Sequence, residues 1–302
     1  MDSIDKGILS DLLANCRQTY QELSRKYGIS ANAIRMRVMK LEESGVIRGY
    51  AINLRPAMLG TNFILALLVT DGSQDEEEFI HTIGKHPGVL AASSYTDGIY
   101  PLVAEYTNAE ELMELGAYLR GLESVVSAEI HPLVVKHGME MKMSGLHIRV
   151  LRHLIDDPRM SIADLSERTG LTSRRVRRLV TELIESDAVD FRALLELGSA
   201  ESIPFLARVL WNESTSEYSE LLSWLQENFE FHLWESYISA SEPVMFCLLT
   251  ADDLSRVDSI AREIRRNDSV ASVKVMISTH HKYFPGLRGI RLSEMVGQKQ
   301  EK

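Results

Sequence analysis

The chain of 302 residues is poor in cysteine, in long apolar runs and in net positive charge. Its two cysteines, Cys16 and Cys247, form no CxxC pair, which argues against a disulfide framework or a cysteine-based zinc site and indicates a reducing compartment. The longest apolar run, at residues 63–69, is far shorter than the roughly 20 residues that span a bilayer. The acidic N-terminus does not fit the basic start of a signal peptide. We therefore expect a cytoplasmic protein with no membrane partner.

The shortage of basic residues is local. The formal net charge is −10, yet residues 1–60 hold nine basic and six acidic residues, and residues 136–198 hold eleven and ten. Residues 61–135, by contrast, hold two basic and twelve acidic residues. Nucleic-acid binding depends on the charge of one face rather than of the whole chain. The first and third segments therefore remain candidates for contact with DNA.

The chain contains an internal repeat. A shift of 142 residues aligns residues 27–47 with 169–189 and residues 62–70 with 204–212, and near the C-terminal ends the shift becomes 145. The apolar pattern persists although few residues are identical. Two apolar patterns that stay aligned over more than a hundred residues indicate a tandem duplication.

The first part of each copy predicts a helix-turn-helix. In the first copy, Gly28 ends a helix over residues 20–27 and Ser30 caps a third helix, with Ile34 and Val38 on its apolar face. Thr172 and Val176 have the same places in the second copy. Residues 45–54 have strand composition and are expected to form a wing beside the helices.

The second part of each copy predicts a ferredoxin-like βαββαβ domain. The expected fold class is therefore α+β, a tandem duplication of a winged helix-turn-helix followed by a ferredoxin-like domain. In the first copy the predicted strands and helices follow one another at residues 63–70, 76–85, 89–96, 100–107, 109–122 and 125–134, and the second copy repeats the order over residues 205–277. The expected segments are winged helix 1–55, ferredoxin-like domain 60–135, linker 136–145, winged helix 146–198, ferredoxin-like domain 202–280 and C-terminal tail 281–302.

The stretches GISANAIRMRVMKLEESGVIRGYAINLRPAMLG (residues 28–60) and HPGVLAASSYTDGIYPLVAEY (residues 86–106) resemble the Lrp/AsnC family of transcriptional regulators. The resemblance implies that the winged module binds double-stranded DNA. It also implies that the ferredoxin-like module, called RAM, dimerises and binds an amino acid or another small effector. We therefore predict a DNA-binding transcriptional regulator that has no catalytic residues and no cofactor.

The predicted DNA contacts lie on the two helices that follow the tight turns. Helical spacing places the polar side chains opposite the apolar face. We expect contacts to base edges from Asn32, Arg35, Arg174 and Arg175. Contacts to phosphate are expected from Arg37, Lys40, Arg178 and the wing residues Arg48 and Arg55, while Ser30 and Arg177 complete the DNA-binding set. The alternative for the arginine run is a solvated helix face.

An effector site is expected from the family resemblance at Tyr95, Thr96, Asp97, Gly98 and Tyr100. The alternative is an ordinary hairpin turn, which Asp-Gly favours. His280 and His281 have no third ligand at a recognisable spacing, so we assign them a surface role and predict no metal site.

The second copy departs from the family pattern at three positions. Asp187 replaces Gly45 after the recognition helix, and DFRALLELGS (residues 190–199) replaces the well-formed wing. Leu179 stands where the first copy has Arg37, and Ala240 replaces Gly98. We therefore expect the second copy to hold phosphate rather than read sequence, and its effector site is in doubt.

Two other interpretations keep the same architecture. Sirohaem decarboxylases resemble it but are enzymes, and neither copy here has their histidine–arginine pair. A non-DNA-binding small-molecule sensor or assembly partner is the other alternative. For the regulator, we expect the two RAM domains of one chain to pair as an intrachain pseudo-dimer and the chains to form homo-oligomers.

Overall fold

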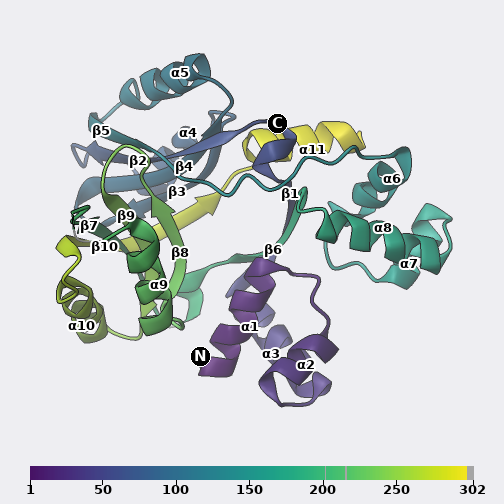
Figure 1. Ribbon diagram of the computed structural model, residues 1–302. Helices are drawn as coiled ribbons and strands as arrows, with labels where there is room; N and C mark the ends of the chain where they lie inside the picture. Colours follow the sequence, from purple (N-terminus) through teal and green to yellow (C-terminus); the bar gives the residue numbers. More distant parts are fainter. Residues whose placement is uncertain (201, 215, 298–302) are drawn as a thin grey trace. The chain divides into compact units, whose positions relative to one another are not determined.

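The computed structural model describes residues 1–200, 202–214 and 216–297 (Figure 1). It forms two compact units, and each contains segments from both copies of the repeat. The winged-helix unit comprises Met1–Thr61, Lys136–Glu196 and Leu287–Lys302, and the sheet unit comprises Asn62–Val135 and Leu197–Gly286. Among the described residues, no helix is both long and apolar enough to cross a membrane.

Local capping signals define the helices of the winged-helix unit. In the first copy they are α1 (Ser3–Ala14), α2 (Tyr20–Tyr27) and α3 (Ala31–Glu43), and in the second copy α6 (Gly145–Leu154), α7 (Ile162–Thr169) and α8 (Ser173–Glu185). Gly28 and Gly170 end α2 and α7 in the left-handed conformation, with φ of 67° and 64°. The side chains of Ser30 and Thr172 then accept hydrogen bonds from the first turns of α3 and α8. The predicted helix-turn-helix is present in both copies.

The strand after each recognition helix does not form a wing hairpin within its own copy. Instead β1 (Ile47–Leu54) pairs antiparallel with β6 (Val189–Leu195), its counterpart in the other copy, with Tyr50 opposite Ala193. The predicted wing strand is present, and the structure adds its partner, which the sequence did not indicate. A single strand leaves its backbone amides and carbonyls unpaired, and the equivalent strand of the other copy satisfies them.

The C-terminal segment differs from the tail that we predicted over residues 281–302. Strand β10 continues to Tyr283, and α11 (Gly286–Val296) follows it. Leu292 and Val296 of α11 are buried in the core of the second winged helix, and Arg152 donates a hydrogen bond to the Val296 carbonyl at 2.8 Å. Residues 298–302 lie outside the described residues.

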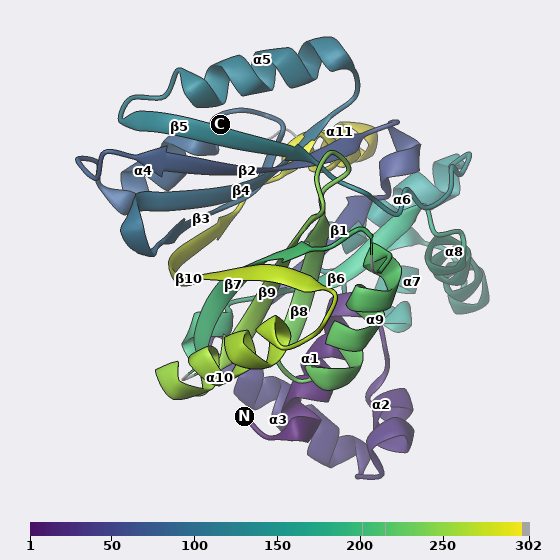
Figure 2. The same cartoon turned by 60° about the vertical axis from the view of Figure 1, so that its left-hand side comes forward.

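The sheet unit contains the predicted βαββαβ order twice (Figure 2). The first copy consists of β2 (Asn62–Thr70), α4 (Glu76–Ile83), β3 (Val89–Tyr95), β4 (Ile99–Tyr106), α5 (Ala109–Arg120) and β5 (Val125–Pro132). The second copy consists of β7 (Ile203–Trp211), α9 (Tyr218–Asn228), β8 (Leu233–Ile238), β9 (Val244–Ala251), α10 (Leu254–Arg265) and β10 (Val270–Tyr283). Short 3-10 turns lie at η1 (Pro56–Met58), η2 (Thr96–Gly98) and η3 (Leu197–Ala200).

The two ferredoxin-like halves share one eight-stranded sheet in the order β5-β2-β4-β3-β10-β7-β9-β8. Strand β10 joins them, because its first part pairs with β7 and its last part, from Ser278 to Tyr283, pairs with β3. At the opposite edges, Leu133 and Ser239 form an isolated bridge. Each half has a core beneath its own helices, and a third cluster, which includes Leu65 and Phe246, joins the two halves. The halves thus associate within one chain, as the predicted pseudo-dimer requires.

Candidate DNA-contacting helices and other polar sites

Helix α3 buries one face and exposes the other. Ile34, Val38 and Leu41 are buried, as their spacing predicts. Six residues are exposed on this helix: Asn32, Arg35, Met36, Lys40, Glu42 and Glu43. Within the described part of the chain, Asn32, Arg35 and Lys40 have no side-chain hydrogen bond or ion pair. These groups are therefore available to a ligand.

Helix α8 has the same division but a more uniform exposed face. Its buried residues are Val176, Leu179, Val180 and Leu183, and its exposed face carries Arg174, Arg175, Arg177 and Arg178. Arg178 forms an ion pair with Glu182 at 3.2 Å. The other three guanidinium groups have no ion-pair partner among the residues that the structure describes. The four arginines therefore lie on a solvated helix face, and together they form a concentrated positive charge.

Besides Arg178, two further predicted phosphate-contacting residues, Arg37 and Arg48, have acidic partners. Arg37 bonds to Asp5 and Asp2 at 2.7 and 2.8 Å, and these hydrogen bonds raise the pKa of Arg37. Arg48 lies 3.4 Å from Glu196 across the β1–β6 ladder. Such partly exposed pairs contribute about 0–1 kcal/mol each. Arg37 therefore ties α3 to the start of α1, and its contact with phosphate remains a prediction.

Arg55 forms similar contacts near the end of β1. Its guanidinium lies 3.2 Å from Asp187 and 3.5 Å from Asp190. These ion pairs link the first copy's strand to the turn and strand of the second copy. They give Arg55 a structural role beside the phosphate contact that we predicted.

The three departures in the second copy have different structural consequences. Asp187 adopts φ of 50°, the left-handed conformation that Gly45 adopts with φ of 76°, so the turn after the helix is retained. An aspartate tolerates this region better than most residues. Leu179 is 2% exposed and belongs to the core, whereas Arg37 lies at the surface. Ala240 belongs to a longer β8–β9 connection without the Asp-Gly turn.

The five predicted effector residues lie on two different faces of the β3–β4 hairpin. Tyr95 belongs to the cluster between the two halves, while Tyr100 belongs to the core under α4 and α5. Thr96 Oγ1 accepts a hydrogen bond from the Ile277 amide at 3.3 Å. Asp97 and Gly98 have φ of 70° and 66°, as expected for a tight hairpin turn. Effector binding at these residues remains a prediction.

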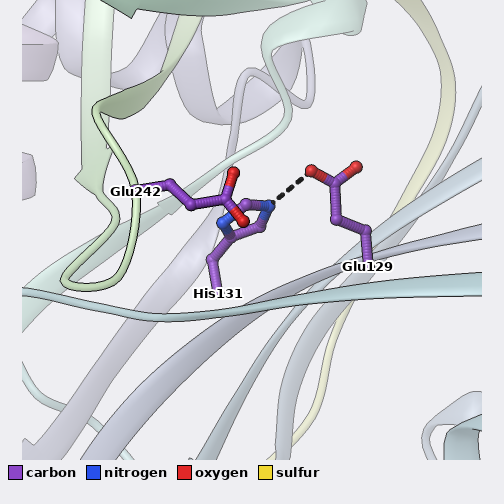
Figure 3. Close-up of side chains that lie close together, drawn as sticks. All are labelled: Glu129, His131 and Glu242. Carbon is purple, nitrogen blue, oxygen red and sulfur yellow. Dashed lines mark hydrogen bonds and ion pairs between the residues drawn. The ribbon is translucent and has the colours of Figure 1, made fainter.

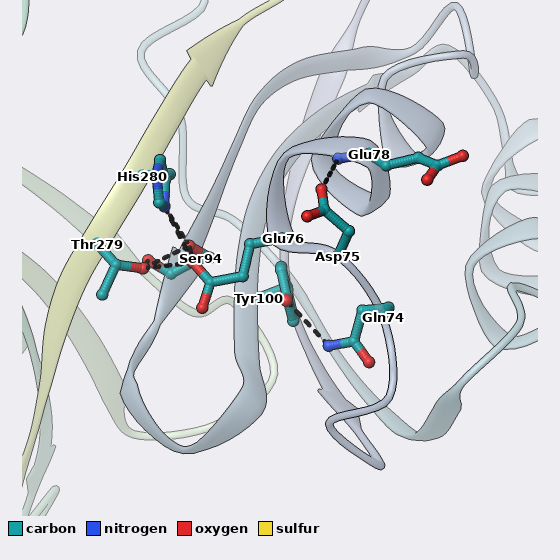
Figure 4. A network of polar contacts seen from close by, with 8 residues as sticks. All are labelled: Gln74, Asp75, Glu76, Glu78, Ser94, Tyr100, Thr279 and His280. Atoms are coloured by element: carbon teal, nitrogen blue, oxygen red, sulfur yellow. Dashed lines mark hydrogen bonds and ion pairs between the residues drawn. The ribbon is translucent and has the colours of Figure 1, made fainter.

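A polar network joins α4, β3 and β10 in the sheet unit (Figure 4). The Glu76 carboxylate accepts hydrogen bonds from Ser94 at 2.8 Å and Thr279 at 3.1 Å, and it contacts His280 at 2.9 Å. The hydrogen bond from Ser94 is the main cause of the lowered pKa of Glu76. His281 contacts Ser93 at 2.7 Å. His280 and His281, to which we assigned a surface role, therefore lie in the ladder that joins the two halves.

Another polar cluster, formed by Glu129, His131 and Glu242, was missed at the sequence level (Figure 3). Glu129 and His131 are two residues apart on β5, which places their side chains on the same face of the strand. Glu242 is more than a hundred residues away in the sequence. The spacing of Glu129 and His131 on one strand face is a signal that could have indicated two of the three residues, but only the fold brings Glu242 to them.

Comparison with known proteins supports the duplication. A family model described as winged helix-turn-helix DNA-binding matches residues 1–48 and again residues 143–190. The regulatory protein AsnC of Escherichia coli (strain K12) is 40% identical over 60 residues, which are 20% of this chain and 40% of that protein. The chain thus spans less than half the length of this relative.

Two archaeal relatives extend the match. LrpA of Pyrococcus horikoshii, an HTH-type transcriptional regulator, is 42% identical over 64 residues, covering 21% of this chain and 45% of that protein. The HTH-type transcriptional regulator Ptr1 of Methanocaldococcus jannaschii is 28% identical over 162 residues, covering 54% of this chain and 99% of its own length. One copy of the repeat therefore corresponds approximately to one whole relative.

A solved structure resembles both copies together. The sirohaem decarboxylase NirDL has a TM-score of 0.55 and 16% identity, covering 98% of this chain and 99% of its own. NirDL in complex with an iron-uroporphyrin III analogue has a TM-score of 0.56 and covers the same shares. At this identity the likeness establishes the fold of the duplicated chain and does not assign it an activity.

Proposed function

We propose that the chain is a DNA-binding transcriptional regulator of the Lrp/AsnC type, because a winged helix-turn-helix model matches it twice and its relatives include AsnC and Ptr1. The observation that carries this proposal is the exposed face of α8, where Arg174, Arg175 and Arg177 have no ion-pair partner among the described residues. Cationic side chains on the second helix of a helix-turn-helix meet the DNA backbone and the major groove.

The two recognition helices are proposed to contact DNA in different ways. On α3, Asn32 and Arg35 occupy the first turns, where a recognition helix approaches base edges, and asparagine and arginine pair well with adenine and guanine. Lys40 then faces phosphate, and the Ser30 hydroxyl can donate to phosphate while its oxygen caps the helix. The first copy is therefore proposed to read sequence.

On α8 the exposed side chains of the run are all arginines. Arg174 and Arg175 lie at its start and can reach bases or phosphates, whereas Arg177 and Arg178 are proposed to contact phosphate. A uniformly cationic face holds the backbone without distinguishing sequences. Since the two helices differ in their exposed residues, the proposed operator is asymmetric rather than palindromic.

Salt dependence of DNA binding tests the role of α8. Fluorescence anisotropy of the full chain on its own upstream DNA gives the slope of log K against log salt. If all four arginines contact phosphate, their joint replacement by alanine reduces the slope by about 3–4 units. The matched control replaces four arginines of the α10 region, Arg256, Arg262, Arg265 and Arg266, and leaves the slope unchanged. An unchanged slope in the α8 variant would refute the role of that helix.

The ferredoxin-like domains are proposed to bind a small effector such as an amino acid. The β3–β4 hairpin with Tyr95, Thr96, Asp97, Gly98 and Tyr100 is the proposed location, on the basis of the family resemblance. Titration of the DNA complex with each amino acid tests the proposal, since a true effector changes the apparent affinity for DNA. An affinity that no amino acid alters argues against this class of effector.

A second candidate function is tetrapyrrole chemistry, favoured by the likeness to NirDL over 98% of the chain. Adding an iron uroporphyrin to the purified full chain tests it directly. A shifted absorption band with one equivalent bound would favour this function over the regulator. No spectral change, together with salt-dependent DNA binding, would favour the regulator.

A further inference from the structure

The cluster Glu129–His131–Glu242 lies where the first ferredoxin-like half faces the second. On β5, Ala128 and Ile130 pack toward the core under α5, so Glu129 and His131 face the opposite side. The His131 side chain is fully buried, with its ring 5.0 Å from that of Phe246 on β9. A polar ring at this depth needs polar partners, because an unpartnered one is costly to bury.

The partners of His131 come from both halves. Its Nε2 lies 2.9 Å from Glu129 Oε1, and its Nδ1 lies 3.2 Å from Ser239 Oγ. Ser239 Oγ also accepts the Glu242 amide at 3.2 Å, which fixes the connection that carries Glu242. The Glu242 carboxylate lies over the imidazole in Figure 3, and one ligand atom from each of the three residues lies within 4.8 Å of the other two.

We infer that Glu129, His131 and Glu242 form a binding site for a divalent transition-metal ion of the zinc type. One imidazole nitrogen and two carboxylates are ligands that such an ion accepts, with bonds of about 2.0–2.2 Å. When the ion binds Nε2, it replaces the hydrogen bond between Nε2 and Glu129, and the one ring proton of the neutral imidazole lies on Nδ1. Nδ1 donates this proton to Ser239, an outer contact of the kind that orients metal-binding histidines. Exposed Glu242 closes the site from the solvent side and leaves a fourth position for water.

Arg208 is the group that opposes metal binding. Its guanidinium bonds to the same oxygen of Glu129 that contacts His131. A carboxylate has a second oxygen, and both side chains are about a third exposed, so Arg208 can move to Oε2 when the ion binds Oε1. Because a cation competes here, Arg208→Gln is expected to tighten metal binding.

The position of the site gives the ion a structural consequence. Glu129 and His131 belong to the first half, whereas Glu242 belongs to the second. Among the described residues, the backbone pairing at this side is one isolated bridge between Leu133 and Ser239, beside the Arg208–Glu129 ion pair. At the other side β10 and β3 form a full ladder. A bound ion would therefore strengthen the weaker of the two connections within the sheet unit.

The test is a metal titration of the full chain after treatment with a chelator. Isothermal titration with Zn²⁺ should show one equivalent per chain, and Co²⁺ should give a visible absorption band. Mg²⁺ should compete poorly, because imidazole suits zinc-type ions better than hard cations. Glu242→Gln should lower Zn²⁺ affinity at least tenfold and remove the rise in melting temperature that Zn²⁺ causes in the parent.

The matched control is His280→Gln, since His280 and Glu76 form another His–Glu pair at 2.9 Å in the same unit, with no third metal-ligating side chain beside it among the described residues. This variant should bind Zn²⁺ as the parent does. Glu242 is exposed, so its replacement leaves the fold intact even if His131→Gln does not. Equal Zn²⁺ affinity in the parent and Glu242→Gln, or a loss of binding in His280→Gln alone, would overturn the inference.

Discussion

Leu179 and Arg37 occupy equivalent positions of the repeat, and their replacement by alanine should have unequal effects. Leu179 is 2% exposed in the core of the second winged helix, so its loss removes transfer energy and leaves a cavity. Leucine-to-alanine changes of this kind cost about 2–5 kcal/mol. Arg37 instead forms two partly exposed ion pairs, each contributing about 0.2–1 kcal/mol.

Urea unfolding followed by far-ultraviolet circular dichroism measures both costs. With an m-value of about 1–3 kcal/mol per molar urea, a loss of 3 kcal/mol lowers the midpoint by about 1–3 M. Arg37→Ala loses two pairs, about 0.4–2 kcal/mol in total, so it should lower the midpoint by less than Leu179→Ala does. The three tryptophans, Trp211, Trp224 and Trp234, all belong to the sheet unit, so their fluorescence reports on that unit as an internal reference. An Arg37→Ala variant that is as destabilised as Leu179→Ala would refute the assignment of core and surface.

Three other outcomes follow from single sites. Gly98→Ala should lower the melting temperature, with a cost of about 1 kcal/mol, because φ of 66° disfavours a side chain. The pKa of Glu76 is lowered in the fold, so its contribution to stability is present above the unfolded-state pKa and is lost as the pH falls through the folded-state pKa. In Glu76→Gln, the urea midpoint should therefore decrease less steeply between pH 6 and pH 3 than in the parent. Burial raises the pKa values of Cys16 and Cys247 to about 12, so neither thiol should react with a thiol reagent at pH 8 until urea unfolds the chain. An equally steep fall of the urea midpoint with pH in Glu76→Gln, or rapid labelling of either thiol in the native protein, would contradict these expectations.

Local signals were enough to predict most elements. Ser30, Gly28 and the apolar spacing of α3 act over a few residues, so the sequence alone indicated where that helix begins and which face it buries. The βαββαβ order likewise followed from alternating patterns, and most predicted ends lie within two residues of the observed ones.

Non-local pairing was harder to predict. The strand composition of β1 indicated a strand but not its partner β6, because backbone pairing carries little sequence information. Asp187 appeared to weaken a turn that the backbone nevertheless retains. The Glu129–His131–Glu242 cluster is likewise non-local, because Glu242 lies in the loop between β8 and β9, which comes close to β5 only in the folded sheet.

The β1–β6 ladder has a consequence for mass action. Equivalent strands supplied by separate subunits would pair with a second-order dependence on protein concentration, whereas these strands belong to one polypeptide. Their association is unimolecular, so dilution to a few molecules per cell does not separate the two winged helices. Because the two winged helices are separate segments of one chain, a substitution changes only one of them. Helix α8 can therefore acquire positive charge that α3 lacks.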